Sequence, residues 1–140
     1  MNAHVPSRRL EALISSGDAL DVRQFRVTEA ISGFFEVTFV AMCLSPDIDF
    51  EANVGLEASF TAHAGAAASR TWTGVCRRIR LLAAEEQGLC TYEVTLVPRL
   101  WLLTQSSGHR VFQQMSEVDI AVAVLARRGI SPELALSSAR

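Results

Sequence analysis

The stretch that decides the fold is CTYEVTLVPRLW, at residues 90–101. Up to Val97, polar residues alternate with an apolar set that consists of Cys90, Tyr92, Val94 and Leu96. A period of two is typical of a strand that buries one face and exposes the other. Pro98 then ends the pattern, because proline suits the first position of a helix and cannot donate to a strand ladder. The stretch therefore predicts a half-buried antiparallel strand followed by a short helix.

Four upstream segments carry the same alternation, at residues 20–27, 35–41, 56–63 and 70–82. It is imperfect in the first of these and blurred in the last, where Gly74 predicts a bulge or a close backbone approach. A Glu-Glu-Gln-Gly turn at residues 85–88 would join the fourth segment to the opening stretch as a hairpin. We expect Phe34 and Phe35 to lie in the core. Five such strands predict a small barrel or sandwich.

The C-terminal third changes its period. Ser116 begins a Ser-Glu-Val-Asp sequence that resembles a capping box, with Asp in place of Glu, and Gly129 stands where a C-cap belongs. An amphipathic helix is expected between them, because one face carries Val118, Ala121, Val122 and Leu125. The fold class that follows is mainly β with C-terminal helices: a small antiparallel β-barrel, then a short helix and one amphipathic helix. Residues 1–17 lack a long periodic pattern and are predicted to be a tail or a pairing arm.

Composition excludes several classes of function. The 140 residues are 49% hydrophobic and 20% charged, with a net charge of -2, so no strong field favours nucleic acid or an anionic membrane. A mean hydropathy of +0.23 favours apolar surface meant for a partner. No apolar run approaches the roughly 20 residues that span a bilayer. Residues 1–9 lack the apolar core of a secretory signal, so no signal peptide and no membrane-spanning segment are expected.

The residues that carry chemistry form no catalytic signature. Neither a Gly-x-Ser-x-Gly motif nor a Cys–His arrangement occurs. The histidines, which we expect to be exposed polar residues, are His4, His63 and His109. The cysteines lack metal-ligand spacing and lie in apolar stretches, which favours reduced, buried thiols; they are Cys43, Cys76 and Cys90. We therefore predict a protein that is not an enzyme, with no catalytic residues, no cofactor and no metal site.

Two charged clusters are expected to be solvated. Residues 47–51 carry acidic side chains at Asp47, Asp49 and Glu51, but without the spacing and central glycine of a calcium loop. A basic cluster consists of Arg77, Arg78 and Arg80, and we expect Glu85 and Glu86 to offset its charge. Neither cluster predicts a binding site.

Several segments, taken in order, resemble one family, the type VI secretion spike protein VgrG. They are EAISGFFEV at 29–37, IDFEANVG at 48–55, RTWTGV at 70–75, YEVTLVPRLWLL at 92–103, and a last group that runs from RVFQ at 110–113 to VDI at 118–120. The resemblance covers about residues 18–130. Asn53-Val54 departs from it, because the family usually has an apolar pair there. Each segment is weak alone, but five in the family's order are specific.

The resemblance implies a structural role. The N-terminal part of VgrG resembles the contractile-phage baseplate hub, a trimeric torus in which each chain supplies two related tube domains to a hexameric ring of Hcp. By this comparison we expect an N-terminal arm or tail at 1–17, a β-barrel tube domain at 18–104, and a truncated helical extension at 105–140. The expected function is to adapt the tube of a contractile injection machine to its spike. The protein would assemble in the cytoplasm and then be ejected by the machine.

Some alternatives remain open from the sequence. A phage tail hub protein would have the same fold and physics, and a free-standing OB-like binding barrel is a different class. The expected partners are a homo-oligomer, trimeric in the family, and an Hcp-like hexameric tube protein. Six copies in a true hexamer are geometrically possible, because the two tube domains are related. Individual interface residues are not identifiable at this stage, since core and partner-facing apolar residues look alike in a sequence.

Overall fold

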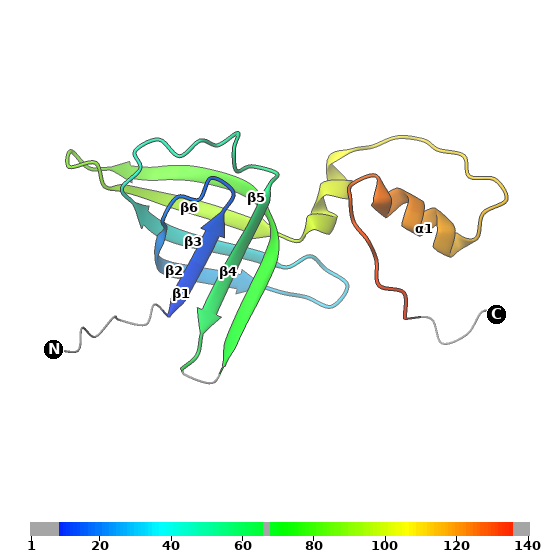
Figure 1. Cartoon of the computed structure of the whole chain (residues 1–140), viewed down its shortest axis with the longest axis horizontal. Coiled ribbons are helices and arrows are strands. Elements are labelled where there is room, and N and C mark those ends of the chain that lie inside the picture. Colours follow the sequence, from blue (N-terminus) through cyan, green and yellow to red (C-terminus); the bar gives the residue numbers. More distant parts are fainter. Residues whose placement is uncertain (1–8, 66–67, 136–140) are drawn as a thin grey trace. The chain divides into compact units, whose positions relative to one another are not determined.

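The computed structural model describes residues 9–65 and 68–135, and in this part of the chain it contains one sheet and two helical segments (Figure 1). The strands are β1 (Leu10–Ile14), β2 (Asp21–Thr28), β3 (Glu36–Cys43), β4 (Glu57–His63), β5 (Ser69–Ala84) and β6 (Cys90–Val97). All neighbours in the sheet are antiparallel, in the order β1-β4-β5-β6-β3-β2. The helical segments are the 3-10 helix η1 (Arg99–Gln105) and α1 (Glu117–Ala126).

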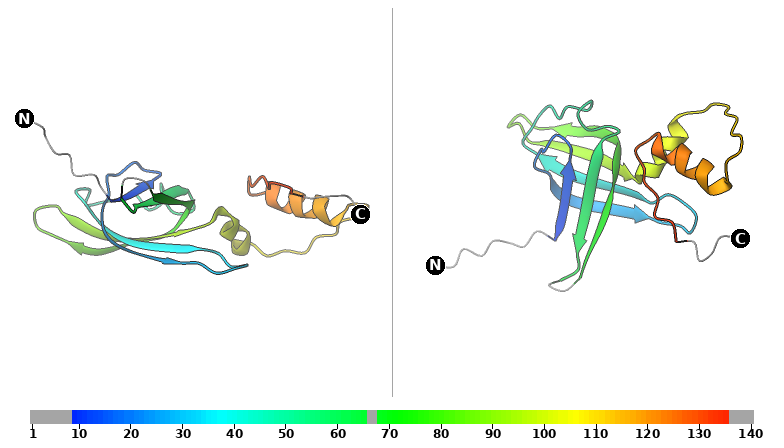
Figure 2. Two further views of the ribbon diagram at one scale, coloured as in Figure 1. Left: turned by 90° about the horizontal axis from the view of Figure 1, so that it is seen from below. Right: turned by 45° about the vertical axis from the view of Figure 1, so that its right-hand side comes forward.

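The 16-residue strand β5 belongs to both halves of the sheet. Its first half, from Ser69 to Val75, pairs with β4, and its second half, from Val75 to Ala84, pairs with β6. The sheet curls along this strand, as the two views in Figure 2 show. The result is a curled six-stranded half-barrel, which agrees with the mainly β barrel-like fold expected from the sequence.

Contacts between aromatic rings on the inner face show how far the sheet curls. The ring centroid of Phe60 on β4 lies 5.0 Å from that of Phe25 on β2 and 5.5 Å from that of Phe39 on β3. On the other side, Trp72 of β5 lies 6.0 Å from Phe60. Because β4 and β2 are far apart in the strand order, their rings meet only if the sheet folds over on itself. The inner face is therefore a closed hydrophobic core, to which all six strands contribute.

The five strands expected from alternation are present, with ends that differ by one or two residues. The imperfect pattern in β2 has a physical cause, since the register with β3 shifts between Val22 and Gln24 and displaces Arg23 from the alternation. A sixth strand, β1, is present in the segment that was predicted to be a tail or a pairing arm. It lies within residues 1–17, pairs with β4 and buries Ala12 and Ile14, so this segment supplies an edge strand of the sheet.

Gly74 allows β5 to pass close to the end of β6. A Cβ atom at Gly74 would overlap the carbonyl oxygen of Val97 and lie 2.8 Å from its carbonyl carbon. The close backbone approach expected from the sequence is confirmed, and a bulge follows between Cys76 and Arg78. Any side chain at position 74 would collide with backbone atoms, which have no room to rotate away.

Two buried polar side chains fasten the long loop between β3 and β4. The Tyr92 hydroxyl donates to the Ser45 carbonyl at 3.2 Å and accepts from the Ile48 amide at 3.4 Å. The Asn53 side chain accepts from the Ser16 amide at 3.0 Å and donates to the Asp49 carbonyl at 2.8 Å. Asn53 is fully buried with both ends of its amide satisfied, so its departure from the family pattern is structurally accommodated.

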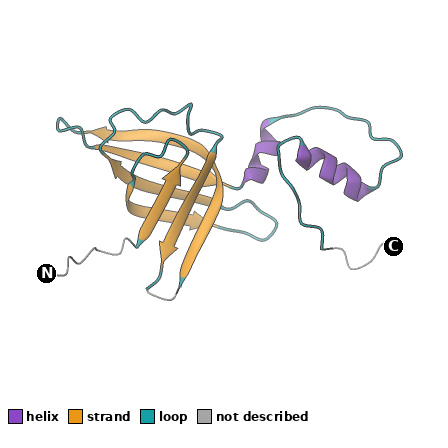
Figure 3. Ribbon diagram, viewed as in Figure 1, coloured by secondary structure: helices purple, strands orange, loops and turns teal. Residues whose placement is uncertain are grey.

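The contacts divide the chain into two units, Met1–Pro98 and Arg99–Arg140, and both helical segments belong to the second (Figure 3). In that unit the Ser116 hydroxyl accepts from the Asp119 amide at 3.2 Å and donates to the Asp119 carboxylate at 2.7 Å. Gly129 has a φ of 64° and its amide bonds the Ala126 carbonyl, while the Ile130 amide bonds Leu125, as in a Schellman motif. Both helix ends are therefore where the sequence placed them.

We expect Gly74→Ala to lower the free energy of unfolding by about 3 kcal/mol, because the added methyl group would overlap the Val97 carbonyl. Urea denaturation followed by tryptophan fluorescence measures this. Gly108→Ala is the control, since a Cβ there meets no atom within 4 Å. Equal stability of the two variants would contradict the close approach.

We expect Asn53→Leu to destabilise the chain by about 2–4 kcal/mol, since it removes the hydrogen bonds to the Ser16 amide and the Asp49 carbonyl from a fully buried position. The same denaturation assay applies. Val54→Thr, at the neighbouring half-exposed position, should change stability by less than about 0.5 kcal/mol. A neutral Asn53→Leu variant would show that the amide is not needed.

Candidate functional site

The side chains with catalytic potential lie on separate elements. His63 ends β4, Cys76 lies in β5 and Asp49 lies in the loop between β3 and β4. The His63 imidazole Nε2 lies 3.4 Å from the Glu11 carboxylate and makes no hydrogen bond among the described residues. Asp49 accepts from the amides of Glu51 and Ala52, at 2.9 and 3.2 Å, and so stabilises its own turn. None of these groups is arranged as a nucleophile beside a base.

The three cysteines are free and buried, in agreement with the expectation of reduced thiols in apolar surroundings. Cys43 and Cys90 are register partners across β3 and β6, while Cys76 faces Leu96 from β5. Burial raises the pKa of the Cys76 thiol to about 11, and a backbone hydrogen bond at Arg78 opposes this only in part. Over residues 9–65 and 68–135, no three metal-binding side chains gather at one place.

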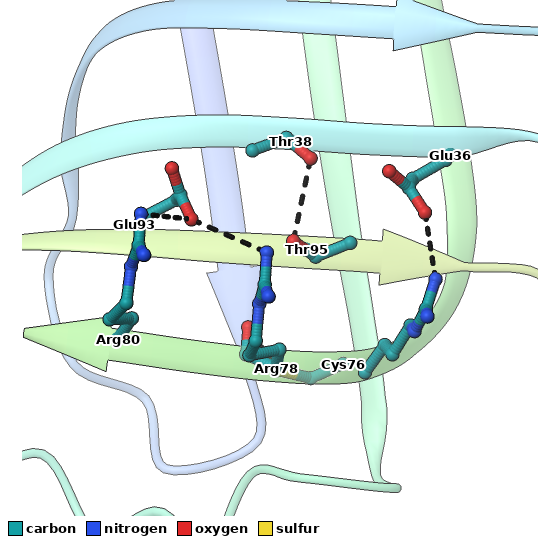
Figure 4. Close-up of polar contacts among 8 residues, drawn as sticks. Glu36, Thr38, Cys76, Arg78, Arg80, Glu93 and Thr95 are labelled. Atoms are coloured by element: carbon teal, nitrogen blue, oxygen red, sulfur yellow. Dashed lines mark hydrogen bonds and ion pairs between the residues drawn. The ribbon is translucent and has the colours of Figure 1, made fainter.

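The outer face of the sheet is polar and internally paired (Figure 4). Arg78 and Arg80 share one carboxylate oxygen of Glu93, at 3.6 and 3.1 Å, and Arg77 contacts Glu36 at 2.9 Å. The expectation that Glu85 and Glu86 offset these arginines is wrong. The partners come from β6 and β3 instead, because cross-strand neighbours lie closer than the turn at the end of the hairpin.

A cluster of three side chains fixes the loop between β2 and β3, residues 29–35. One Glu29 oxygen accepts from Arg70 at 2.6 Å and from the Trp72 indole at 3.0 Å. The Arg70 guanidinium lies 4.7 Å from the centre of the Trp72 ring. Two of the segments that carried the family resemblance therefore meet here, and their role is to hold this loop.

The loop between β2 and β3, residues 29–35, exposes apolar side chains to solvent. Ile31 is 99% exposed and Phe34 is 43% exposed. Phe34 was expected in the core, and this prediction is wrong, whereas Phe35 packs against the core cluster as predicted. Ser32 has a φ of 60°, which turns the chain sharply between them. Leu44, at the far end of β3, is 79% exposed. Ile31 and Phe34 thus place two exposed apolar side chains on one loop.

The sheet has two open edges. Among the residues that the structure describes, β1 and β2 each pair on one side only, so each presents a row of backbone donors and acceptors without a strand partner there. Because the sheet has six strands and all its neighbours are antiparallel, the two edge strands run in opposite directions. One edge of a copy would therefore extend the antiparallel pattern at the opposite edge of another.

No helix in the described part of the chain is long and apolar enough to cross a membrane.

Comparisons with known proteins agree with this geometry. A model of the family described as phage tail baseplate hub (GPD) matches residues 28–140. The type VI secretion system spike protein VgrG1c of Pseudomonas aeruginosa is 27% identical over 114 residues, which cover 81% of this chain and 16% of that protein. A solved E. coli component of the type VI secretion system, itself structurally similar to the T4 bacteriophage tail proteins gp27 and gp5, superposes with a TM-score of 0.73 at 25% identity. That match covers 85% of this chain and 32% of the solved one.

The raised pKa of Cys76 predicts an alkaline loss of stability. The folded chain retains the thiol proton up to about pH 11, whereas the unfolded thiol has the ordinary value of 9.0, so stability falls as the pH rises through this window. This difference in pKa contributes at most about 3 kcal/mol to the free energy of unfolding. In urea titrations at pH 8 to 11, Cys76→Ala should flatten the decline, whereas Cys43→Ala should retain it. An unchanged slope in Cys76→Ala would refute the assignment.

Proposed function

The chain belongs to the phage tail baseplate hub (GPD) family, and from this premise we propose that it adapts the tube of a contractile injection machine to the spike. Membership makes the chain a structural component of such a machine. The observation that carries the proposal is the extent of the match, which begins at the last residue of β2 and includes the strands β3 to β6 and α1. The chain spans 16% of the curated relative and 32% of the solved one, so the activities of those whole proteins remain proposals for it.

The proposed partners are further copies of the chain and a hexameric tube protein of the Hcp type. The open edges β1 and β2 and the apolar loop 29–35 support self-association, because each offers a surface that the isolated chain does not cover. A ring of related barrel domains about one axis would match the symmetry of a hexameric tube ring. Trimers with two tube domains per chain and hexamers with one both satisfy this requirement.

The proposed role is mechanical, without catalysis. The side chains considered as catalytic candidates, His63, Cys76 and Asp49, lie on separate elements. Such a component would assemble in the cytoplasm and leave with the ejected tube and spike. A phage-like tail gives the same physical role, and the solved relative's likeness to both machines is consistent with either setting.

We expect the wild-type chain to bind a hexameric tube ring from the same genome, and Ile31→Asp to weaken that assembly at least tenfold. The charged side chain would have to be buried at the interface, whereas folding is unaffected because Ile31 is 99% exposed in the chain alone. Sedimentation velocity of the mixed proteins measures the binding, and circular dichroism checks the fold. Ile31→Leu is the conservative control and should assemble normally. Failure of the wild-type chain to bind any tube ring would overturn the proposed function.

A further inference from the structure

The C-terminal unit contains a basic hollow of about 640 Å³, bounded by the loop after η1 and by the end of α1. Its guanidinium groups come from Arg110, Arg127 and Arg128, and its apolar lining comes from Leu103, Phe112 and Val124. No acidic side chain lines the hollow among the residues that the structure describes. It therefore combines positive charge with an apolar wall.

These three arginines have no counter-charge within the described chain. The ion pairs of residues 9–65 and 68–135 all lie in the sheet unit, and none of them involves the three guanidinium groups. Arg127 and Arg128 follow the last residue of α1, where the helix dipole favours positive charge. The dipole stabilises their positive charge modestly and does not neutralise it. A ligand that carries carboxylates would provide the bidentate partners that guanidinium groups prefer.

The tip of the β5–β6 hairpin, residues 81–88, has the complementary character. Leu81 and Leu82 are exposed, and Glu85 and Glu86 carry carboxylates that make no ion pair with any described residue. The turn is fixed by hydrogen bonds of 2.9 Å from the Gly88 amide to the Glu85 carbonyl and from the Glu85 amide to the Leu89 carbonyl. The tip is thus an ordered acidic and apolar projection.

We propose that the basic hollow binds the hairpin tip of a second copy of this chain. The carboxylates of Glu85 and Glu86 would pair with the three arginines, and the leucines would contact the apolar wall. The hollow and the tip are different surfaces, so each copy offers one of each and the contact repeats head to tail, closing into a ring where the rotation permits. The inference rests on the proposed function in taking another copy as the partner.

Reversed charges test this contact in the full chain. One variant carries Glu85→Arg and Glu86→Arg, and the other carries Arg127→Glu and Arg128→Glu. Each variant alone brings like charges together at every contact, and we expect its self-association to weaken at least tenfold in sedimentation velocity. In a 1:1 mixture, the altered tip meets the altered hollow and the native tip meets the native hollow. The mixture should therefore recover association to within about threefold of the wild-type chain.

Recovery on mixing cannot arise from misfolding, because two damaged proteins would not repair each other. Asp47→Arg with Glu51→Arg is the matched control: it changes the net charge as much as the tip variant does, at another exposed acidic loop, and should associate normally. Wild-type association in either single variant, or no recovery in the mixture, would overturn the proposal. Tube-ring binding, measured in parallel, separates the outcomes: if it persists while the contact fails, only the contact is wrong.

Discussion

The close passage of β5 over the end of β6 at Gly74 is the constraint on which the rest of the structure depends. Because no side chain intervenes, β5 is shared by two halves of one sheet and the sheet can curl along it. Only then does Phe60 reach Phe25 and Phe39 across the interior. The curl also sets the positions of the loops that connect the strands and of the two open edges of the sheet.

The inner face of the curled sheet is filled with buried side chains, so interactions with other proteins must use the surfaces outside it. The inner face buries apolar side chains from all six strands, and the outer face pairs its arginines with Glu93 and Glu36. Among the described residues, the surfaces without a partner lie elsewhere: the strand edges, the apolar loop 29–35, the acidic hairpin tip and the basic hollow. A component whose role is assembly carries its function in such groups rather than in a cleft with convergent catalytic side chains.

Much of the fold could be predicted from the sequence because period-two alternation depends only on which residues face the core. Five strands, the hairpin turn at 85–88 and both ends of α1 followed from local patterns. β1 was predicted only as part of a tail or a pairing arm, because its five residues are too few to show a long period, and it forms through pairing with β4. Phe34 was misplaced because an exposed phenylalanine and a buried one look alike in a sequence. The partners of Arg78 and Arg80 depended on strand register, which no local pattern specifies.

The sequence by itself determined the class of the fold, its family and the absence of a catalytic signature. These properties depend on residue types and short spacings, which can be recognised in the amino-acid sequence alone. Only the tertiary structure decided that Glu29, Arg70 and Trp72 meet, that Asn53 is buried and satisfied, and which charged groups stay unpaired. The reason is physical: pairing and burial depend on distances between residues far apart in the chain, and the curl of the sheet sets those distances.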